Sequence, residues 1–270
     1  MTRSRSARRR ALLSALLLAA PFALMHPAQA DQLDNITAAK KIRIGVDLSV
    51  PPYGMKDEKL NSTGSDVDTA RLIAKNLGLE LEIVPTMGAN RIPFLVTDKV
   101  DIVVSSFSIT PERQKVIDFS TPYAAILAVV GAPKAMSIKT PADLVGKRIA
   151  VGRGSTNEAE LNKIVPAGAQ VVRFDDDATS ITAVISGQAD AFATAPSLFN
   201  RINQLAPAKQ METKIVMQAN MLGIGLRKNE PALKARIDAI VKANLQGPLN
   251  EIYRKYHGTD LPADLLKSGD

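Results

Sequence analysis

The chain has 270 residues, no cysteine, and 34 basic against 27 acidic residues, which gives a formal net charge of +7. Without cysteine it can form no disulfide and build no Cys-ligated metal site. Five of the basic residues lie within the first 30 positions, which contain no acidic residue, so the rest of the chain has 29 basic and 27 acidic residues. That small excess, without a long basic stripe, argues against a nucleic-acid partner.

Residues 1–30 have the three parts of a secretory signal peptide: an arginine-rich start, an apolar stretch at residues 11–25, and the small-residue end Ala28-Gln29-Ala30. We expect cleavage before Asp31 and export to the periplasm. A membrane anchor is the alternative, but the apolar stretch is short and is interrupted by a proline. The remaining residues are numerous enough to bury a core, or two smaller ones, without disulfides.

Strands and helices are predicted to alternate in the part of the chain that follows. Residues 42–47 alternate as a strand does, and residues 66–77 place their apolar side chains on one helical face and end before Gly78. The next predicted elements are a strand at 81–84, a short helix at 91–97 and a strand at 100–105. This order indicates an α/β lobe with mostly parallel strand pairing.

A second α/β lobe is predicted after the apolar run at residues 123–130. Thr140 and Ser155 each precede an acidic residue by three positions, which is the capping-box pattern of a helix start. The further predicted elements are strands at 148–151, 171–174, 191–193 and 222–226, and helices at 178–186, 231–246 and 248–256. No long Pro/Gly/Ser linker separates the lobes, which favours two extended crossings between them.

The run from Ser105 to Arg113 places three serine hydroxyls and one guanidinium where a strand ends and a helix begins. Thr110 is expected to cap that helix, with Pro111 as its first residue. Arg113 can then fold back toward the serines, and a guanidinium binds a carboxylate through two parallel hydrogen bonds. The run therefore predicts a site for a small carboxylic acid. A capped helix with an exposed arginine is the alternative.

Motifs for catalysis, metal binding and nucleotide binding are scarce. His257 is the one histidine after the predicted signal peptide, and we interpret it as a surface residue rather than a general base. Asp175-Asp176-Asp177 lacks the spacing of a calcium loop and is interpreted as an exposed acidic turn. Gly152-Arg153-Gly154 lacks the third glycine of a dinucleotide motif. We therefore expect no cofactor, no metal and no enzymatic activity.

A series of short motifs follows in order along the chain: Ile44-Gly45-Val46-Asp47 with Pro51-Pro52-Tyr53, Gly64-Ser65-Asp66-Val67-Asp68, Ser105 to Arg113, Asp118-Phe119-Ser120 with Pro122-Tyr123, Asp143-Leu144-Val145-Gly146-Lys147, and Gly187-Gln188-Ala189-Asp190-Ala191. Each motif alone is weak. Their order and spacing together resemble the family 3 extracellular solute-binding proteins, the polar amino-acid receptors of ABC importers.

The resemblance implies a two-lobed periplasmic-binding-protein fold of type II, an α/β fold in which each lobe is a mostly parallel sheet flanked by helices. Residues 31–125 and 221–270 would form the first lobe. Residues 126–220 would form the second lobe, inserted into the first and joined to it by two hinge crossings. The ligand would lie in the cleft between the lobes.

The resemblance also implies roles for particular residues. Ser106 and Ser108 would face the ligand's α-amino end, and Arg113 would hold its α-carboxylate. Ser155 and Thr156, at a helix N-terminus of the second lobe, would donate amide hydrogen bonds to the same carboxylate. An anion held by both lobes gives lobe closure a physical cause. The complete set of expected ligand contacts is Asp47, Tyr53, Arg91, Ser105, Ser106, Ser108, Arg113, Ser155 and Thr156.

The chain departs from the family pattern around the expected site. Ala195 stands where the family usually has an acidic partner for the α-ammonium group, and Val50 and Gly88 stand where aromatic residues are common. Arg91 and Arg153 add positive charge near the site, with a solvated surface position as the alternative for each. These departures favour an anionic ligand: an acidic amino acid, or an organic acid without an ammonium group.

The sequence thus predicts a periplasmic receptor, a monomer, that captures a small carboxylate and delivers it to an inner-membrane ABC permease. An enzyme on the same scaffold is the first alternative, because a periplasmic cyclohexadienyl dehydratase is similar to this family. Asp47 and Arg91 would then serve as its acid and its cation. A sensory binding protein that acts on a separate receptor or kinase is the second alternative.

Overall fold

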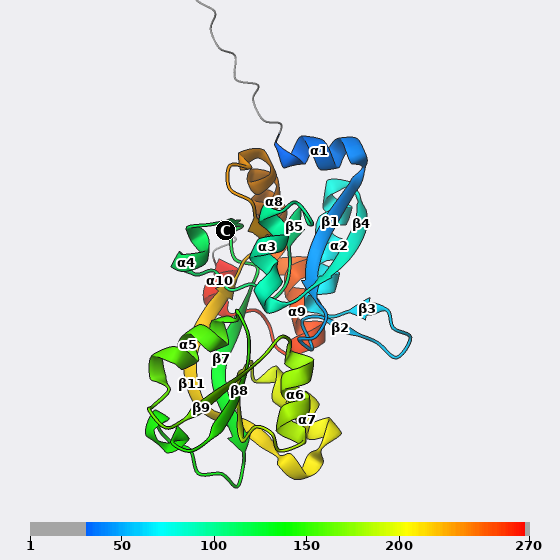
Figure 1. The fold of residues 1–270 in the computed structure, drawn as a ribbon. Helices are drawn as coiled ribbons and strands as arrows, with labels where there is room; N and C mark the ends of the chain where they lie inside the picture. The colour runs from blue at the N-terminus through cyan, green and yellow to red at the C-terminus, as the bar shows by residue number, and fades with distance from the viewer. Residues whose placement is uncertain (1–30, 268–270) are drawn as a thin grey trace, which may run out of the picture. The chain divides into compact units, whose positions relative to one another are not determined.

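The computed structural model describes residues 31–267 (Figure 1). The predicted signal peptide and its cleavage position therefore lie outside the described residues. Two five-stranded sheets, each with its own helices, account for most of this part of the chain. We call the first sheet with its helices the first lobe, and the second sheet with its helices the second lobe.

The first sheet has the strand order β4-β1-β5-β12-β6. Its strands are β1 (Lys41–Asp47), β4 (Glu80–Thr86), β5 (Ile102–Val103), β6 (Asp118–Phe119) and β12 (Gly225–Leu226). β1 pairs in parallel with β4 and β5, whereas β12 pairs antiparallel with β5 and β6. The side chains of Ile42, Ile44 and Val46 are fully buried, so β1 lies at the centre of this lobe's core.

The helices of the first lobe come from both ends of the described chain. They are α1 (Gln32–Ala39), α2 (Ser65–Leu77), α3 (Arg91–Val96), α4 (Pro111–Gln114), α8 (Pro231–Asn244), α9 (Asn250–His257) and α10 (Ala263–Lys267). A small hairpin of β2 (Met55–Lys56) and β3 (Ser62–Thr63) precedes α2, and a kinked π turn at Leu245–Leu249 joins α8 to α9.

The second sheet has the strand order β11-β7-β10-β8-β9. Its strands are β7 (Ala124–Pro133), β8 (Arg148–Gly152), β9 (Gln170–Phe174), β10 (Ala191–Thr194) and β11 (Met211–Leu222). Its helices are α5 (Thr156–Ile164), α6 (Asp177–Ile185) and α7 (Ser197–Leu205), with 3-10 turns at Pro141–Leu144 and Pro207–Lys209. The capping boxes predicted at Thr140 and Ser155 both mark helical starts, although the first opens only a 3-10 turn.

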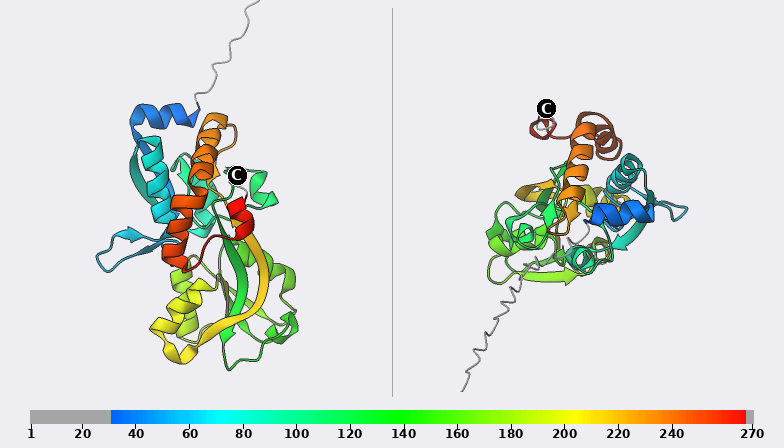
Figure 2. Two further views of the ribbon diagram at one scale, coloured as in Figure 1. Left: turned by 180° about the vertical axis from the view of Figure 1, so that it is seen from behind. Right: turned by 90° about the horizontal axis from the view of Figure 1, so that it is seen from above.

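Two long strands, β7 and β11, connect the sheets. They pair antiparallel from Ala124 with Leu222 to Pro133 with Met211, and Figure 2 shows them side by side in the view from behind. β7 takes the chain away from the first sheet and β11 brings it back. In the first sheet β12 is antiparallel to both neighbours, and in the second sheet β7 is antiparallel to both neighbours, so half of the strand pairings in each sheet are antiparallel. The predicted mostly parallel pairing therefore holds for only half of the pairings. We propose that the hinge crossings lie at residues 125–126 and 220–221.

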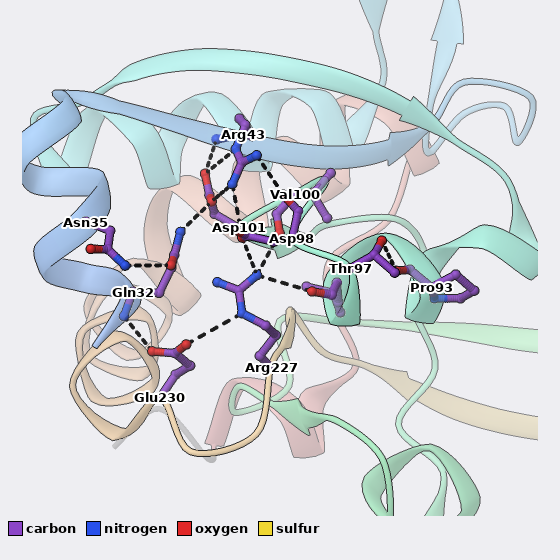
Figure 3. Close-up of polar contacts among 11 residues, drawn as sticks. Gln32, Asn35, Arg43, Pro93, Thr97, Asp98, Val100, Asp101, Arg227 and Glu230 are labelled. Atoms are coloured by element: carbon purple, nitrogen blue, oxygen red, sulfur yellow. Dashed lines mark hydrogen bonds and ion pairs between the residues drawn. The ribbon is translucent and has the colours of Figure 1, made fainter. Parts of the chain in front are cut away.

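A polar network fixes the start of the described chain to the first sheet (Figure 3). The buried carboxylate of Asp101 accepts hydrogen bonds from the guanidinium and the backbone N–H of Arg43, both at 2.6 Å, and from the side chain of Gln32 at 2.7 Å. Arg227 forms ion pairs with Asp98 and Glu230 at 3.0 and 3.5 Å. The network joins α1, β1 and β5 to the segment before α8.

Within residues 31–267, the helices are all too short or too polar to cross a lipid bilayer.

Asp31 caps two helices that are about 200 positions apart in the sequence. Its side chain accepts a hydrogen bond from the backbone of Leu33 at 3.0 Å, at the start of α1. It also accepts from Ala232 and Leu233 at 2.8 and 3.1 Å, in the first turn of α8. One carboxylate thus satisfies N–H groups that would otherwise lack partners at both helix starts.

Replacing Asp31 should therefore cost more than a surface substitution. We expect Asp31→Ala to lower the free energy of unfolding by about 1 to 2 kcal/mol, the usual cost of losing an N-cap. Chemical denaturation of the chain from Asp31 onward measures this change. Asp34→Ala, an exposed position in the first turn of α1, is the matched control. Equal losses in the two variants would contradict the capping role.

His257, predicted to be a surface residue, is partly buried at the end of α9. Its ring stacks on Tyr253 at a centroid distance of 4.2 Å, lies 4.6 Å from the ring of Tyr53, and places Nε2 3.1 Å from the hydroxyl of Ser65. Burial lowers the pKa of His257 from 6.5 to about 4. The prediction that His257 is a surface residue was wrong, because its ring packs against the rings of Tyr53 and Tyr253 in the first lobe.

This pKa shift predicts a pH dependence of stability. Between about pH 6.5 and pH 4 the unfolded chain binds a proton at His257 that the folded chain does not bind, so His257 makes stability fall as the pH falls. We expect His257→Gln to lose less stability than the wild type over this interval. Thermal unfolding between pH 4 and pH 7 measures the difference. Parallel curves for the two proteins would contradict the buried, neutral state of His257.

Candidate interlobe site

Most of the predicted ligand contacts lie where strands of the two sheets reach their carboxyl ends. Asp47 ends β1, and the segment after β5 carries Ser105, while in the second lobe Thr156 follows β8. Such strand ends are the usual place for ligands in α/β proteins. We call the following residues the interlobe site: Asp47, Arg91, Ser105, Ser106, Ser108, Arg113, Ser155, Thr156 and Asp177.

Direct contacts join the two lobes at this site. The hydroxyl of Ser108 lies 3.1 Å from that of Thr156, and the Nη2 of Arg113 donates to the carbonyl of Gly154 at 3.2 Å. Gly154 has φ +71°, and a Cβ atom there would lie only 2.9 Å from the Cα of Ala89. This close approach requires glycine. Arg113 and the Gly154 turn, predicted to share one ligand, are thus neighbours.

The local sequence directs Arg113 toward the serines, as predicted. Thr110 caps α4 by accepting a hydrogen bond from the backbone of Arg113 at 3.3 Å, and Pro111 is the first helical residue. The Nη1 of Arg113 donates to the carbonyl of Ser108 at 2.8 Å. The guanidinium lies 4.7 Å from the centre of the Phe107 ring, which adds a cation–π contact. A capped helix with a freely exposed arginine is therefore ruled out.

Arg113 has no acidic hydrogen-bond partner among the described residues, because its guanidinium donates to the carbonyls of Ser108 and Gly154. Burial, reinforced by the positive charge of Arg91, lowers the pKa of Arg113 to about 9. A bound carboxylate would supply the missing negative charge and reverse this shift. The electrostatics of the site therefore favour an anion at Arg113.

Arg91, in contrast, is buried and paired. Its Nη2 lies 3.2 Å from Asp47, and its Nε donates to the hydroxyl of Ser105 at 3.2 Å. Ser105 in turn accepts a hydrogen bond from the backbone of Asp47 at 3.0 Å. Arg91 therefore does line the site, but Asp47 offsets its charge. Arg153 matches the surface alternative instead, because its side chain is 52% exposed and pairs with Asp175 at 3.3 Å.

Asp66 holds Ser106 in place, a role that sequence analysis missed. Ser106 has φ +41°, in the left-handed region that favours glycine, and its backbone N–H donates to Asp66 at 2.6 Å. The hydroxyl of Tyr123 donates to the other oxygen of Asp66 at 2.7 Å. Burial raises the pKa of Asp66 to about 6, although both hydrogen bonds act to lower it. Gly64-Ser65-Asp66 and Tyr123 were recognised as family motifs, but their contact joins segments distant in the sequence.

Ser155 and Thr156 occupy the helix start predicted for them. Ser155 caps α5 by accepting from the backbone of Glu158 at 3.1 Å, and Glu158 accepts from the backbone of Gly154 at 2.8 Å. Thr156 is the first helical residue, and a first-turn N–H group has no acceptor within its own helix. The geometry suits an anion at this helix start. The ligand contacts of Ser155 and Thr156 stay predictions.

Tyr53 lies apart from the rest of the predicted set. Its hydroxyl donates to the carbonyl of Ala125 at 3.4 Å, and its ring contacts His257. It lines a cavity of about 1200 Å³ whose walls include residues 125–127 and 219–221 of the crossing strands and part of α7. Of the predicted ligand contacts, this cavity includes only Tyr53. That Tyr53 contacts the ligand stays a prediction. Its position away from the other predicted contacts argues against that role.

The three consecutive aspartates have three different environments. Asp175 is exposed and pairs with Arg153, and Asp176 caps α6 by accepting from the backbone of Thr179 at 2.7 Å. Asp177 is partly buried, with Oδ1 3.4 Å from the hydroxyl of Thr194. The predicted exposed acidic turn is therefore wrong for Asp177. Within residues 31–267, no group of three or more His, Cys, Asp or Glu side chains is arranged to hold a metal ion.

Comparison with known proteins places the chain among bacterial binding proteins. Residues 42–259 match the family described as bacterial extracellular solute-binding proteins, family 3. The L-cystine-binding protein TcyJ of Escherichia coli K12 is 30% identical over 263 residues, which cover 94% of this chain and 97% of that protein.

Two solved structures have the same fold. The solute receptor for L-cysteine of Neisseria gonorrhoeae is 28% identical, with a TM-score of 0.78 over 84% of this chain and 93% of that one. The ancestral amino acid-binding protein AncCDT-1, a precursor of cyclohexadienyl dehydratase, is 33% identical, with a TM-score of 0.74 over 84% and 99%. The chain has the predicted two-lobed periplasmic-binding-protein fold, and it belongs to the family 3 bacterial extracellular solute-binding proteins.

Proposed function

We propose that this protein is a monomeric periplasmic receptor that captures an α-amino acid at the interlobe site and delivers it to an ABC permease of the inner membrane. The observation that carries the proposal is the guanidinium of Arg113. It contacts carbonyl groups of both lobes and has no acidic partner among the described residues. Membership of the solute-binding family and the predicted signal peptide support the receptor role and the periplasmic location.

We propose further that the side chain of the ligand is neutral rather than acidic. The sequence favoured an anionic ligand because Ala195 replaces the usual acid, aromatic residues are missing at Val50 and Gly88, and Arg91 and Arg153 add positive charge. Asp47 offsets the charge of Arg91, and Asp175 offsets that of Arg153. Arg113 is left with one positive charge to be balanced, and the α-carboxylate of a neutral amino acid suffices for that. A second ligand carboxylate without an ammonium group of its own would find Arg91 and Arg153 already paired with aspartates.

Among neutral amino acids, cystine and cysteine are the first candidates. They are the ligands named for the Escherichia coli and Neisseria gonorrhoeae relatives, which match nearly the full length of their own chains. Cystine carries two α-carboxylates and two α-ammonium groups, so its net charge is zero. The absence of aromatic residues at Val50 and Gly88 would leave room for a ligand longer than cysteine.

The enzyme alternative has less support. Its acid and cation would be Asp47 and Arg91, which bind each other in a buried pair and are not free to act on a substrate. The related ancestral protein is itself named an amino acid-binding protein. A receptor, in contrast with an enzyme, does not need Asp47 and Arg91 to be free of each other.

The charges at the interlobe site predict an order of ligand affinities. Isothermal titration calorimetry of the chain from Asp31 onward should show binding of L-cystine, or of L-glutamine as a second neutral ligand, at about micromolar Kd. L-glutamate, L-arginine and succinate should bind at least about tenfold more weakly, a difference of about 1.4 kcal/mol. Tighter binding of L-glutamate or succinate than of any neutral amino acid would contradict the neutral ligand. Conversion of added prephenate to a product with aromatic ultraviolet absorbance would instead support the enzyme alternative.

The role of Arg113 predicts a large loss of binding in its alanine variant. Two hydrogen bonds to a charged group contribute about 1.5 to 3 kcal/mol each. Arg113→Ala should therefore weaken binding of the tightest amino acid at least about a hundredfold while the chain stays folded. Lys115→Ala, an exposed position just after α4, is the control. Unchanged affinity in Arg113→Ala would remove Arg113 from the site.

A further inference from the structure

A receptor for an α-amino acid needs an acceptor for the ligand's ammonium group. In this chain the usual acidic position is Ala195, which is 97% buried and has no polar side-chain atom. Serine hydroxyls and backbone carbonyls can accept hydrogen bonds from an ammonium group but carry no charge to balance it. Another carboxylate would have to balance the charge of the ammonium group.

Two carboxylates of the first lobe are already occupied. Asp47 accepts hydrogen bonds from the backbone and the hydroxyl of Ser49, at 3.0 and 2.7 Å, and pairs with Arg91. Asp66 is 99% buried and accepts from Ser106 and Tyr123. The oxygens of both carboxylates are buried and already accept hydrogen bonds from the protein. We therefore interpret Asp47 and Asp66 as residues that position the site rather than as acceptors for the ligand.

Asp177 is placed differently. Its Oδ1 lies 3.4 Å from the hydroxyl of Thr194, which ends β10 and directly precedes Ala195. A Cβ atom at Gly152, which ends β8, would lie 3.7 Å from the same oxygen. The carboxylate of Asp177 thus lies at the ends of β8 and β10, whereas Ala195, the residue after Thr194, lines the cavity beside Tyr53. Among the described residues, the hydrogen-bond partner of the Asp177 carboxylate is the hydroxyl of Thr194, at a long distance, and Asp177 is only partly buried.

The first lobe faces this carboxylate. The charges of Asp47 and Arg91 both act on Asp177, and Asp176 acts on it from its own helix start. Burial and then the repulsion by Asp47 raise the pKa of Asp177 to about 7, because the attraction of Arg91 is too weak to offset them. A cation between the lobes would relieve this repulsion.

We propose that Asp177 binds the α-ammonium group of the ligand and replaces the acidic residue that the chain lacks at position 195. This inference rests on the proposed amino-acid receptor function. It assigns the ligand two charged ends: a carboxylate on Arg113 and an ammonium group on Asp177. Organic acids without an amine would satisfy only the first. Asp177 starts α6, whereas position 195 follows β10, so the replacement would come from a different segment of the second lobe.

The test combines a residue change with a ligand change. Asp177→Asn keeps the shape of the side chain and removes its charge, and Asp175→Asn, in the exposed part of the same turn, is the matched control. L-cystine is compared with 3,3′-dithiodipropionate, which lacks both amino groups, and L-glutamine with glutaramate, which lacks its α-amino group. Calorimetry measures each Kd for the wild type and the two variants. Thermal unfolding without ligand establishes that Asp177→Asn is folded.

We expect Asp177→Asn to bind the amino acid at least about 30-fold more weakly than the wild type, as the loss of a hydrogen bond between charged groups implies. Asp175→Asn should bind it within about threefold of the wild type. The preference of the wild type for each amino acid over its analogue should shrink in Asp177→Asn. Amino-acid binding within about threefold of the wild type in a folded Asp177→Asn protein overturns the role of Asp177. A wild type that binds no α-amino acid overturns the proposed function itself.

Discussion

The interlobe site depends on one guanidinium that both lobes contact. Arg113 donates to the carbonyl of Ser108 in the first lobe and to that of Gly154 in the second, and no described carboxylate balances its charge. A positive charge that is partly removed from water and paired only with neutral groups is costly, and an anion relieves that cost. Because the donors and the helix start of α5 come from different lobes, an anion bound there stabilises their contact.

The rest of the first lobe holds this guanidinium in position. Thr110 caps the helix that carries it, the Phe107 ring lies beneath it, and Asp66 fixes the unusual backbone of Ser106. The pair of Arg91 with Asp47 has a second effect. It adds a cation to the site whose charge Asp47 offsets, and under the proposed function this leaves Arg113 as the cation that holds the ligand's carboxylate. In our proposal Asp177 is then the acceptor for the ligand's ammonium group.

Local sequence patterns predicted much of this architecture. The cap at Thr110, the start of α5 at Ser155 and the strands β1, β8 and β9 follow from residues adjacent in the chain, and the structure has them where they were expected. Contacts between distant segments were not predictable in this way. The ion pair of Asp47 with Arg91, the bond of Asp66 to Ser106 and the inward position of Asp177 depend on tertiary packing. The helices α1 and α7 were also missed, because they have only 8 and 9 residues and so give short periodic patterns.

The most direct test of the account is a crystal structure of the protein bound to its tightest-binding amino acid. The account predicts that the α-carboxylate lies on the guanidinium of Arg113 and the first amide groups of α5, with the ammonium group within hydrogen-bond distance of Asp177. A ligand bound in the cavity beside Tyr53, or one between the lobes whose carboxylate does not contact Arg113, would contradict it.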